Sequence, residues 1–295
     1  VSRADVDAVC ICTPSGAHEA VALAAAAAGK HLMIEKPLEI ALDRIDRIIA
    51  AADAAGVKLG CVLPSRFMHG VEATKAALDG GRLGKLTLAS ASIPWFRSQE
   101  YYDGSAWRGT WELDGGGALM NQGIHTIDLL QWLVGPATSV YGQTTTLSHA
   151  IETEDTAAAI LSLESGGIGT IRAGTGCYPG EPAKVELYGD RGTVVLEEGK
   201  VTVWKLADAS SDEEARMSGQ DATPGSGASD PMGITADRHR ALLADLIAAI
   251  HEDREPAVSG AEARKSVELI RAIYASAKCG CPVSLPLVED GGGTS

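Results

Sequence analysis

The sequence predicts an α/β domain with a parallel sheet, followed by an α+β domain with a mostly antiparallel sheet. In the first part, short apolar runs alternate with helix-like segments, an order typical of parallel strands joined by right-handed crossovers. After Pro64 the pattern changes to alternating strands separated by glycine-containing turns, which is typical of antiparallel sheets. We therefore expect one domain over residues 1–65, a second over 66–287 and a flexible tail over 288–295.

The first domain is expected to contain three buried strands and two helices. The second helix shows this best, since Ile45, Ile48 and Ile49 recur at helical spacing before Gly56 ends the pattern. The expected strands cover residues 7–13, 31–34 and 58–63, and the expected helices cover 17–28 and 40–55.

The second domain combines strands with helices at both ends. Between residues 93 and 118 we expect a polar, aromatic loop, and over 207–231, where apolar residues are few, an irregular mobile loop. The expected strands cover 85–93, 139–148, 156–174 and 183–205, and the expected helices cover 71–78, 118–134, 236–251 and 261–277.

Composition excludes several classes of partner. The formal net charge of −14 argues against nucleic acid and anionic membranes, which select for excess Lys and Arg. No apolar run approaches the roughly 20 residues that span a bilayer, and the first residues lack the features of a signal peptide. We therefore expect a cytoplasmic protein.

The six cysteines fit no standard zinc-binding pattern. Cys10 and Cys12 lie in an apolar run, where we expect them to be buried as small hydrophobic residues. The sequence thus predicts reduced cysteines, no disulfide framework and no metal site.

The segment 115–135 carries the strongest chemical signal. On a helix, Asn121 and His125 share one face and Asp128 lies beside His125, so an amide and a carboxylate could orient the imidazole as a general base. The alternative is a histidine that simply satisfies an ordinary hydrogen bond. Three glycines, Gly115 to Gly117, precede the helix, and we expect them to let the backbone approach a ligand closely.

Two strand ends supply further candidates. Glu35, Lys36 and Pro37 follow a buried strand, where a lysine could donate to a substrate hydroxyl or could merely be solvated. Thr13-Pro14 could pack against a nicotinamide ribose or simply end a strand. His18, in the first turn of a helix, could be a surface residue or lie near a cofactor.

Aromatic residues gather in the loop that is expected between residues 93 and 118 of the second domain. They could line a sugar pocket, or equally pack in the core or against another subunit. The residues are Trp95, Tyr101, Tyr102, Trp107 and Trp111. His239 and His251, on the closing helices, are expected to be ordinary surface or interface residues.

Taken together, three segments resemble the glucose–fructose oxidoreductase/inositol dehydrogenase (Gfo/Idh/MocA) family. They are TPSGAH (13–18), AAGKHLMIEKPL (27–38) and GGGALMNQGIHTIDLLQWLVG (115–135). The resemblance implies a Rossmann domain that binds NAD or NADP, followed by a large sheet domain. It also implies helices on one face of that sheet, and subunit contacts, often on the other face, in a homo-oligomer.

The resemblance also implies a reaction and its residues. A hydride would pass between nicotinamide and a hydroxyl-bearing carbon of a sugar, polyol or sugar derivative, including nucleotide-activated sugars. Lys36 would contact nicotinamide and substrate, His125 would be the general base, and the Lys36–Pro37 bond would be cis. Many relatives carry Asp where this chain has Asn121, which leaves Asn121 a positioning role. The implied substrate contacts are Asn121, Asp128, Tyr102 and Trp107, and the implied cofactor contacts are Thr13, Pro14, His18, Glu35, Lys36 and Pro37.

The sequence departs from the family in the motif that binds the phosphates of the dinucleotide. The sequence contains no G-x-G-x-x-G motif, so we expect the phosphate-binding unit to lie upstream of this chain. The alternative is a divergent member of the family that uses no cofactor. If the unit lies upstream, the 295 residues alone should bind NAD(H) weakly or not at all, and the exposed edge of strand 7–13 should favour self-association. Two other functions stay open: a glycosidase that uses NAD transiently, and a non-catalytic sugar-binding or regulatory relative.

Overall fold

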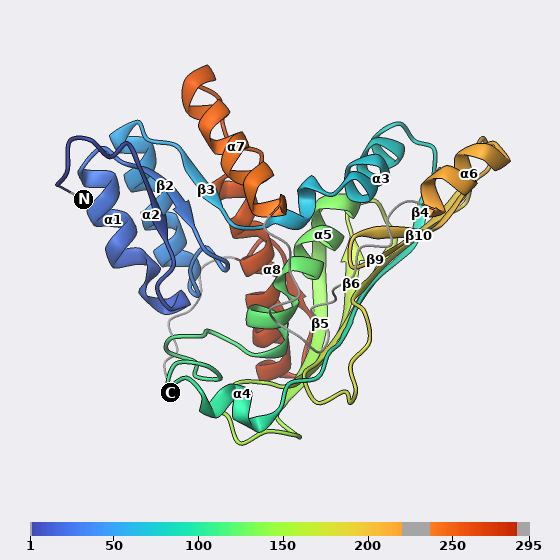
Figure 1. Ribbon diagram of the computed structural model, residues 1–295. Coiled ribbons are helices and arrows are strands. Elements are labelled where there is room, and N and C mark those ends of the chain that lie inside the picture. Colours follow the sequence, from blue (N-terminus) through green and yellow to red (C-terminus); the bar gives the residue numbers. More distant parts are fainter. Residues whose placement is uncertain (1, 220–236, 288–295) are drawn as a thin grey trace.

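The protein consists of a small parallel sheet and a large mixed sheet that lie side by side (Figure 1). A computed structural model describes residues 2–219 and 237–287. Because the small sheet lies near the N-terminus and the large sheet follows it, the predicted order of α/β and then α+β is confirmed.

The small sheet has three parallel strands in the order β1-β2-β3, as predicted. The apolar run 31–34 becomes β2 without any change of bounds, because all but its first residue are buried. The elements are β1 (Ala8–Ile11), a 3-10 turn (Ser15–Ala17), α1 (His18–Ala27), β2 (His31–Ile34), α2 (Leu42–Ala55) and β3 (Leu59–Cys61).

The expected burial of Cys10 and Cys12 is wrong. Both side chains are exposed, whereas Ile11 between them belongs to the hydrophobic core. Strand β1 lies at the edge of the small sheet and alternates its side chains between two faces, so only one face of it is covered.

The large sheet has eight strands in the order β10-β9-β8-β4-β7-β6-β5-β11. Among the strands that residues 2–219 and 237–287 form in this sheet, only β4 and β7 pair in parallel, so the expectation of a mostly antiparallel sheet is confirmed. The strands are β4 (Leu86–Pro94), β5 (Ala137–Thr145), β6 (Thr156–Leu163), β7 (Ile168–Gly174), β8 (Lys184–Gly189), β9 (Gly192–Glu197), β10 (Lys200–Leu206) and β11 (Val283–Ser284).

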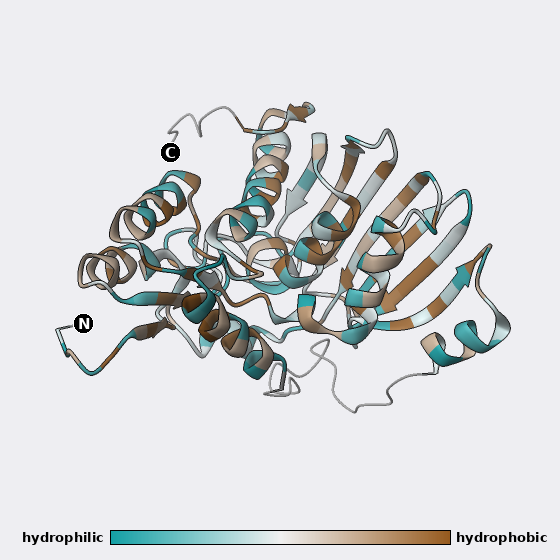
Figure 2. Cartoon of the chain, turned by 90° about the horizontal axis from the view of Figure 1, so that it is seen from above, coloured by the Kyte–Doolittle hydropathy of each residue, from teal (hydrophilic) through white to brown (hydrophobic). Residues whose placement is uncertain are grey.

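Helices cover one face of the large sheet. In β6, Ala157, Ala159 and Leu161 are buried, while Ile160 is 55% exposed on the opposite face. Brown, hydrophobic segments recur along these strands and along the helices beside them (Figure 2). The covering helices include α3 (His69–Asp79), α5 (Ile124–Val134) and α8 (Gly260–Cys279).

The helix expected over 118–134 begins differently from the prediction. Residues Ala118–Gly123 form one turn of π-helix before α5 starts at Ile124. Such turns wind more widely than an α-helix and recur at functional sites. The glycines before it approach other parts of the protein: a Cβ at Gly116 would meet the hydroxyl of Tyr274, and one at Gly117 would meet the carbonyl of Glu154. The expectation that these glycines admit a ligand is therefore not supported by their contacts.

Two segments expected to be loops contain helices. The aromatic loop includes α4 (Gln99–Asp103). The segment 207–231 includes α6 (Ser211–Ser218), whose first turn is capped by the Ser210 hydroxyl and enriched in acidic residues, both of which favour a helix start. Residues 220–231 of that expected loop, and the tail 288–295, lie outside the described residues. The closing helices are α7 (Asp237–Glu252) and α8.

One further expectation about the cysteines is wrong. Cys279 and Cys281 form a disulfide at the end of α8. Gly280 between them adopts a left-handed conformation with φ of 65°, which reverses the chain and brings the two sulfur atoms together.

None of the helices described is long and apolar enough to cross a membrane.

Candidate active site

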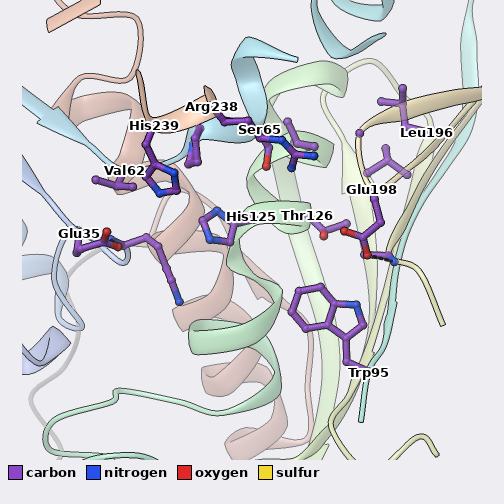
Figure 3. Close-up of a pocket in the computed structure, with 16 residues that line it drawn as sticks. Glu35, Val62, Ser65, Trp95, His125, Thr126, Leu196, Glu198, Arg238 and His239 are labelled. Atoms are coloured by element: carbon purple, nitrogen blue, oxygen red, sulfur yellow. Dashed lines mark hydrogen bonds between the residues drawn. The ribbon is translucent and has the colours of Figure 1, made fainter. Parts of the chain in front are cut away.

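A cavity of about 230 Å³ opens between the carboxyl ends of the small sheet and the large sheet (Figure 3). Loops at the carboxyl ends of parallel strands are where α/β folds place ligands. Its lining includes Glu35, Lys36, Val62, Ser65, Trp95, His125, Thr126, Leu196, Glu198, Arg238 and His239. The cavity therefore collects side chains from the small sheet, the large sheet, α5 and α7.

Lys36 enters this cavity from the end of β2, and its peptide bond to Pro37 is cis, as the family resemblance implied. The amine Nζ donates to the backbone oxygen of Asn121 at 2.7 Å and to its side-chain Oδ1 at 3.1 Å. Burial lowers the pKa of the Lys36 amine. Because an ammonium group carries three N–H bonds, one remains for a ligand after these two contacts.

Asn121 is held in turn by a buried carboxylate. Its Nδ2 donates to Oδ1 of Asp114 at 2.5 Å, and the other oxygen of Asp114 accepts the backbone N–H of Gly109 at 2.8 Å. This arrangement orients the amide, so that Oδ1 of Asn121 faces Lys36. Asp114 is only 1% exposed, and burial raises the pKa of its carboxyl to about 6.

His125 lies in the first turn of α5 and lines the cavity. Burial, with smaller contributions from the positive charges of Lys36, His239 and Arg238, lowers the pKa of its imidazole to about 3. The ring is therefore neutral near pH 7. Its Nδ1 is buried and has no hydrogen-bond partner among the residues the structure describes. A neutral imidazole with an unused nitrogen can accept a proton.

The predicted convergence of Lys36, Asn121 and His125 on one cleft stays a prediction, and two observations support it. Lys36 and His125 line one cavity, and Asn121 reaches the same place through its hydrogen bonds to Lys36. Of the other residues after β1 and β2, Glu35 lines the cavity, while Thr13 and Pro14 lie at the end of β1 outside its lining.

Asp128 does not lie against His125 as expected. Its carboxylate accepts from Nε and Nη2 of Arg66 at 2.9 and 2.7 Å, and from the hydroxyl of Ser266 at 2.8 Å. Asp128 is 1% exposed, so this pairing supplies the partners that a buried carboxylate requires. The residue ties α5 to the turn at Pro64–Phe67 and to α8.

His18 is neither a surface residue nor open to a cofactor through its ring nitrogens. It is fully buried; Nδ1 lies 3.1 Å from the carbonyl of Pro37, and Nε2 lies 2.9 Å from the carbonyl of Thr13. Its ring connects the loops that follow β1 and β2. His18 thus positions the segment that carries Lys36.

The aromatic residues divide between two environments. Trp95 lines the cavity, whereas Tyr102 and Trp107 lie outside its lining, and their expected contact with substrate stays a prediction. The Tyr102 hydroxyl instead donates to Thr175, and Trp107 packs beside the guanidinium of Arg108. Both belong to the segment around α4, which was expected to be a polar, aromatic loop.

Sequence reasoning missed Asp114, Arg238 and Glu198, and treated His239 as an ordinary residue. Asp114 directly precedes the three glycines, which was the available signal. Arg238 and His239 come from α7, far away in sequence, and only the fold brings them to Lys36. Among the described residues, no group of three or more His, Cys, Asp or Glu side chains could hold a metal ion.

Two segments of the chain match family models. Residues 1–62 match the oxidoreductase family with the NAD-binding Rossmann fold, and residues 71–195 match the GFO/IDH/MocA C-terminal domain. These matched segments meet at the cavity, since the first supplies Lys36 and the second His125.

Solved structures of two dehydrogenases are similar over almost the whole chain. The WlbA dehydrogenase of Bordetella pertussis, solved with NADH and UDP-GlcNAcA, is 35% identical with a TM-score of 0.84, covering 95% of this chain and 79% of that one. The WlbA dehydrogenase of Chromobacterium violaceum, solved with the same two ligands, is 32% identical with a TM-score of 0.85, covering 97% and 80%.

Curated relatives are more distant. The myo-inositol 2-dehydrogenase of Thermotoga maritima is 27% identical over 222 residues, which is 72% of this chain and 63% of that protein. An oxidoreductase of Bacillus subtilis, YrbE, is also 27% identical, and the match spans 59% of its length. From the two family matches and the similarity to the Bordetella enzyme, we conclude that the chain belongs to the Gfo/Idh/MocA family of oxidoreductases, with the NAD-binding Rossmann fold in its N-terminal part.

Proposed function

We propose that the protein oxidises a hydroxyl group of a sugar, polyol or sugar derivative with NAD. The observation that carries the proposal is one cavity in which a neutral imidazole and a lysine amine with an unused N–H lie together. A base and a charge stabiliser are the two groups that removal of a hydroxyl proton requires.

His125 is the proposed general base. Its low pKa keeps the ring unprotonated at neutral pH, so it can take the proton of a bound hydroxyl. Its Nδ1 has no hydrogen-bond partner among the described residues, so this nitrogen is available to a ligand. The pKa also implies that the protonated ring is disfavoured, so the proton must leave His125 again quickly or a ligand must stabilise it.

Lys36 is the proposed electrostatic partner of the substrate oxygen. Two of its N–H bonds donate to Asn121, and these contacts orient the third N–H bond toward the cavity. Asp114 fixes the amide of Asn121, so the contacts form a chain from a buried carboxylate to the cavity. In this proposal Asn121 and Asp114 position Lys36 and do not react.

The residues at the carboxyl edge of the small sheet fit a nicotinamide. A bound NAD would supply the hydride acceptor there. Glu35, Lys36 and Pro37 after β2, with Thr13 and Pro14 after β1, are the residues that we propose hold it, and His18 braces both loops. The NADH-bound dehydrogenases of similar fold support this assignment.

Formation of NADH tests the proposal. The full-length wild-type protein is mixed with excess NAD and a panel of sugars, polyols and sugar derivatives, and the absorbance of reduced cofactor is followed. A dehydrogenase accumulates NADH with at least one member of the panel. Release of aglycone from glycosides without net NADH would instead favour a glycosidase, and binding without any turnover would favour a non-catalytic role.

We also propose that the uncovered face of the large sheet forms a homo-oligomer contact. Large apolar side chains are exposed along it, among them Leu88 (42%), Ile160 (55%) and Ile168 (53%). A hollow of about 710 Å³ runs over the same face and is lined by residues of β4 to β8. Contiguous apolar surface of this kind is typical of protein–protein contacts.

Ile160→Glu tests this contact by light scattering. It places a charge at the centre of the face and should reduce the oligomer to monomers. Leu147→Glu is the matched control, because Leu147 is 72% exposed but lies outside that hollow. An assembly that is intact in Ile160→Glu, or a wild-type monomer, would show that the face has another use.

A further inference from the structure

The large sheet supplies one wall of the cavity. Ala183, Val185 and Leu196 contribute apolar side chains to this wall, and Trp95, which directly follows β4, contributes an indole ring. The Trp95 side chain is buried, with 8% exposed. Because an indole has one N–H donor and no acceptor, Trp95 is the member of this group whose side chain can form a directed hydrogen bond.

The indole Nε1 of Trp95 is buried and has no hydrogen-bond partner among residues 2–219 and 237–287. Glu198, the lining carboxylate beyond the indole nitrogen in Figure 3, accepts the N–H of Ala183 at 2.8 Å and forms no hydrogen bond with Trp95. A buried N–H without an acceptor is unfavourable, and such groups are rare in folded proteins. An acceptor that a ligand brings to the cavity would remove this cost.

Neighbouring side chains hold the indole ring in this orientation. The guanidinium carbon of Arg97 lies 5.0 Å from the centre of the Trp95 ring, within the range of a cation–π contact. Arg97 is 4% exposed, and its Nε donates to Oε1 of Gln122 at 3.1 Å. Gln122 follows Asn121 in the π-helical turn, so this turn contacts Lys36 through one residue and the support of Trp95 through the next. The indole donor is therefore positioned before any ligand binds.

The indole nitrogen and the imidazole of His125 form a pair in this cavity. Each has a buried nitrogen without a partner among the described residues, and both residues belong to the lining. Figure 3 shows Glu35 and Trp95 on opposite sides of His125. Since the reacting hydroxyl is assigned to His125 and to Lys36, which follows Glu35, Trp95 lies where a different oxygen of the same substrate would be.

We propose that Trp95 is a specificity-determining residue whose indole N–H donates to the oxygen of a second hydroxyl group of the substrate, not the hydroxyl that reacts. The inference rests on the proposed function, because it assumes that a sugar, polyol or sugar derivative occupies the cavity. A hydroxyl oxygen can accept this hydrogen bond, whereas a carbon that carries only hydrogen cannot. A substrate without that hydroxyl leaves the buried N–H unsatisfied, and sites built around a buried polar group strongly reject such analogues.

Steady-state kinetics of the full-length protein test this contact. The substrates are glucose, myo-inositol and UDP-glucose, one for each class in the proposed function, with the monodeoxy analogues that retain the reacting hydroxyl. The proteins are wild type, Trp95→Phe and Trp132→Phe. Phenylalanine keeps an aromatic ring and removes the N–H. Trp132 is the matched control, because it is partly buried but lies outside the lining of this cavity.

Trp95→Phe should lower kcat/KM for the parent substrate by about 5- to 100-fold, the effect of leaving one buried polar group without its hydrogen bond. One monodeoxy analogue should react equally well with wild type and Trp95→Phe, because the oxygen that pairs with the indole is already absent from it. The other analogues should show the same loss as the parent substrate. Trp132→Phe should match wild type with every substrate.

The indole signal of Trp95 in NMR spectra gives a measurement that does not depend on turnover. The full-length protein is prepared with isotope-labelled tryptophan and saturated with NADH, so that no oxidation occurs. The Trp95 N–H signal, assigned by its loss in Trp95→Phe, should move downfield when the parent substrate is added, because a hydrogen bond forms. It should not do so with the analogue that lacks the paired hydroxyl.

Wild-type kcat/KM in Trp95→Phe for every substrate would overturn the inference. So would an equal loss for the parent substrate and all of its analogues, which would give Trp95 a structural role, or a Trp95 signal that moves with NADH and not with substrate, which would assign the donor to the cofactor. Failure of the proposed function is distinguishable from these outcomes. A Trp95 signal that responds to substrate while no NADH forms would reject the dehydrogenase and keep the contact, whereas turnover that is insensitive to Trp95→Phe would do the reverse. If none of the three compounds is bound or oxidised, both proposals fail.

Discussion

The amine of Lys36 and the carboxamide of Asn121, 85 residues apart in sequence, are joined by a hydrogen bond of 3.1 Å, and a second bond of 2.7 Å runs from the same amine to the Asn121 backbone. These contacts connect the end of the parallel strand β2 to the π-helical turn before α5. They place the proposed charge stabiliser beside the helix that carries His125.

Lys36→Met should disable catalysis without harming the fold. Methionine has similar length but cannot donate, so kcat/KM should fall by about 10²–10³-fold, the usual effect of losing one donor to a developing oxyanion. Thermal stability should be unchanged or higher, since a buried ammonium is removed. Steady-state kinetics and calorimetry measure the two effects, and Lys85→Met, at an exposed position, is the control. Normal turnover in Lys36→Met would assign Lys36 a structural role only.

Asp114 should leave a signature in the pH dependence of stability. Its pKa is raised from 3.8 to about 6 in the folded protein, so the folded state holds a proton that the unfolded chain releases between these values. Stability should therefore fall as pH rises through this window, by about 3 kcal/mol in total. Asp114→Asn should lack this component.

Urea unfolding at several pH values measures that component as the difference between wild type and variant. Asp212→Asn, at an exposed position, should reproduce the wild-type curve. If the free energies of unfolding of wild type and Asp114→Asn change in parallel between pH 4 and 6, Asp114 is not the carboxyl whose pKa is raised.

Asp128→Ala should destabilise the protein. It leaves the buried Arg66 guanidinium without its bidentate partner, which typically costs about 3–5 kcal/mol. Asp5→Ala removes the partner of the exposed Arg3 instead, and should leave the free energy of unfolding almost unchanged. Denaturant unfolding gives both values. A stable Asp128→Ala with strongly reduced turnover would restore the expected partnership of Asp128 with His125.

The imidazole of His125 should stay neutral across the physiological range. With its pKa lowered to about 3, protonation of this ring is absent at pH 5 and above in the ligand-free protein. The unfolded chain binds this proton near pH 6.5, whereas the folded protein does not. The free energy of unfolding therefore decreases as pH falls below about 6.5. NMR titration of the His125 resonance, assigned with a His125→Asn variant, measures this; a midpoint near 6.5 would contradict it.

The sequence was most informative where the residues of one short segment determine the local structure. The apolar run 31–34 became β2 unchanged, and the glutamate–lysine–proline triplet followed it into the cavity. The spacing of Asn121 and His125 indicated a functional helix, but not its π-helical first turn, because local spacing does not show the contacts that Asn121 makes with the distant Lys36.

Residues whose role depends on distant partners could not be assigned from the sequence. Arg66, 62 positions from Asp128, decides the environment of that carboxylate. The carbonyls of Thr13 and Pro37 together bury His18. Arg238 reaches the cavity only because α7 packs beside the strand ends. In each case the tertiary fold supplied the partner, and residue type alone was equally consistent with a surface position.

The central claim, that His125 is the base of a dehydrogenase, is tested most directly by turnover of His125→Asn in the full-length protein, with NAD and a sugar that the wild type oxidises. Asparagine keeps some polarity but cannot take the proton, so turnover should fall by about 10²–10⁴-fold while affinity for NADH is retained. His251→Asn, exposed in the last turn of α7, should behave as wild type. Near-normal turnover of His125→Asn would contradict the account and leave His125 as a buried residue of the fold.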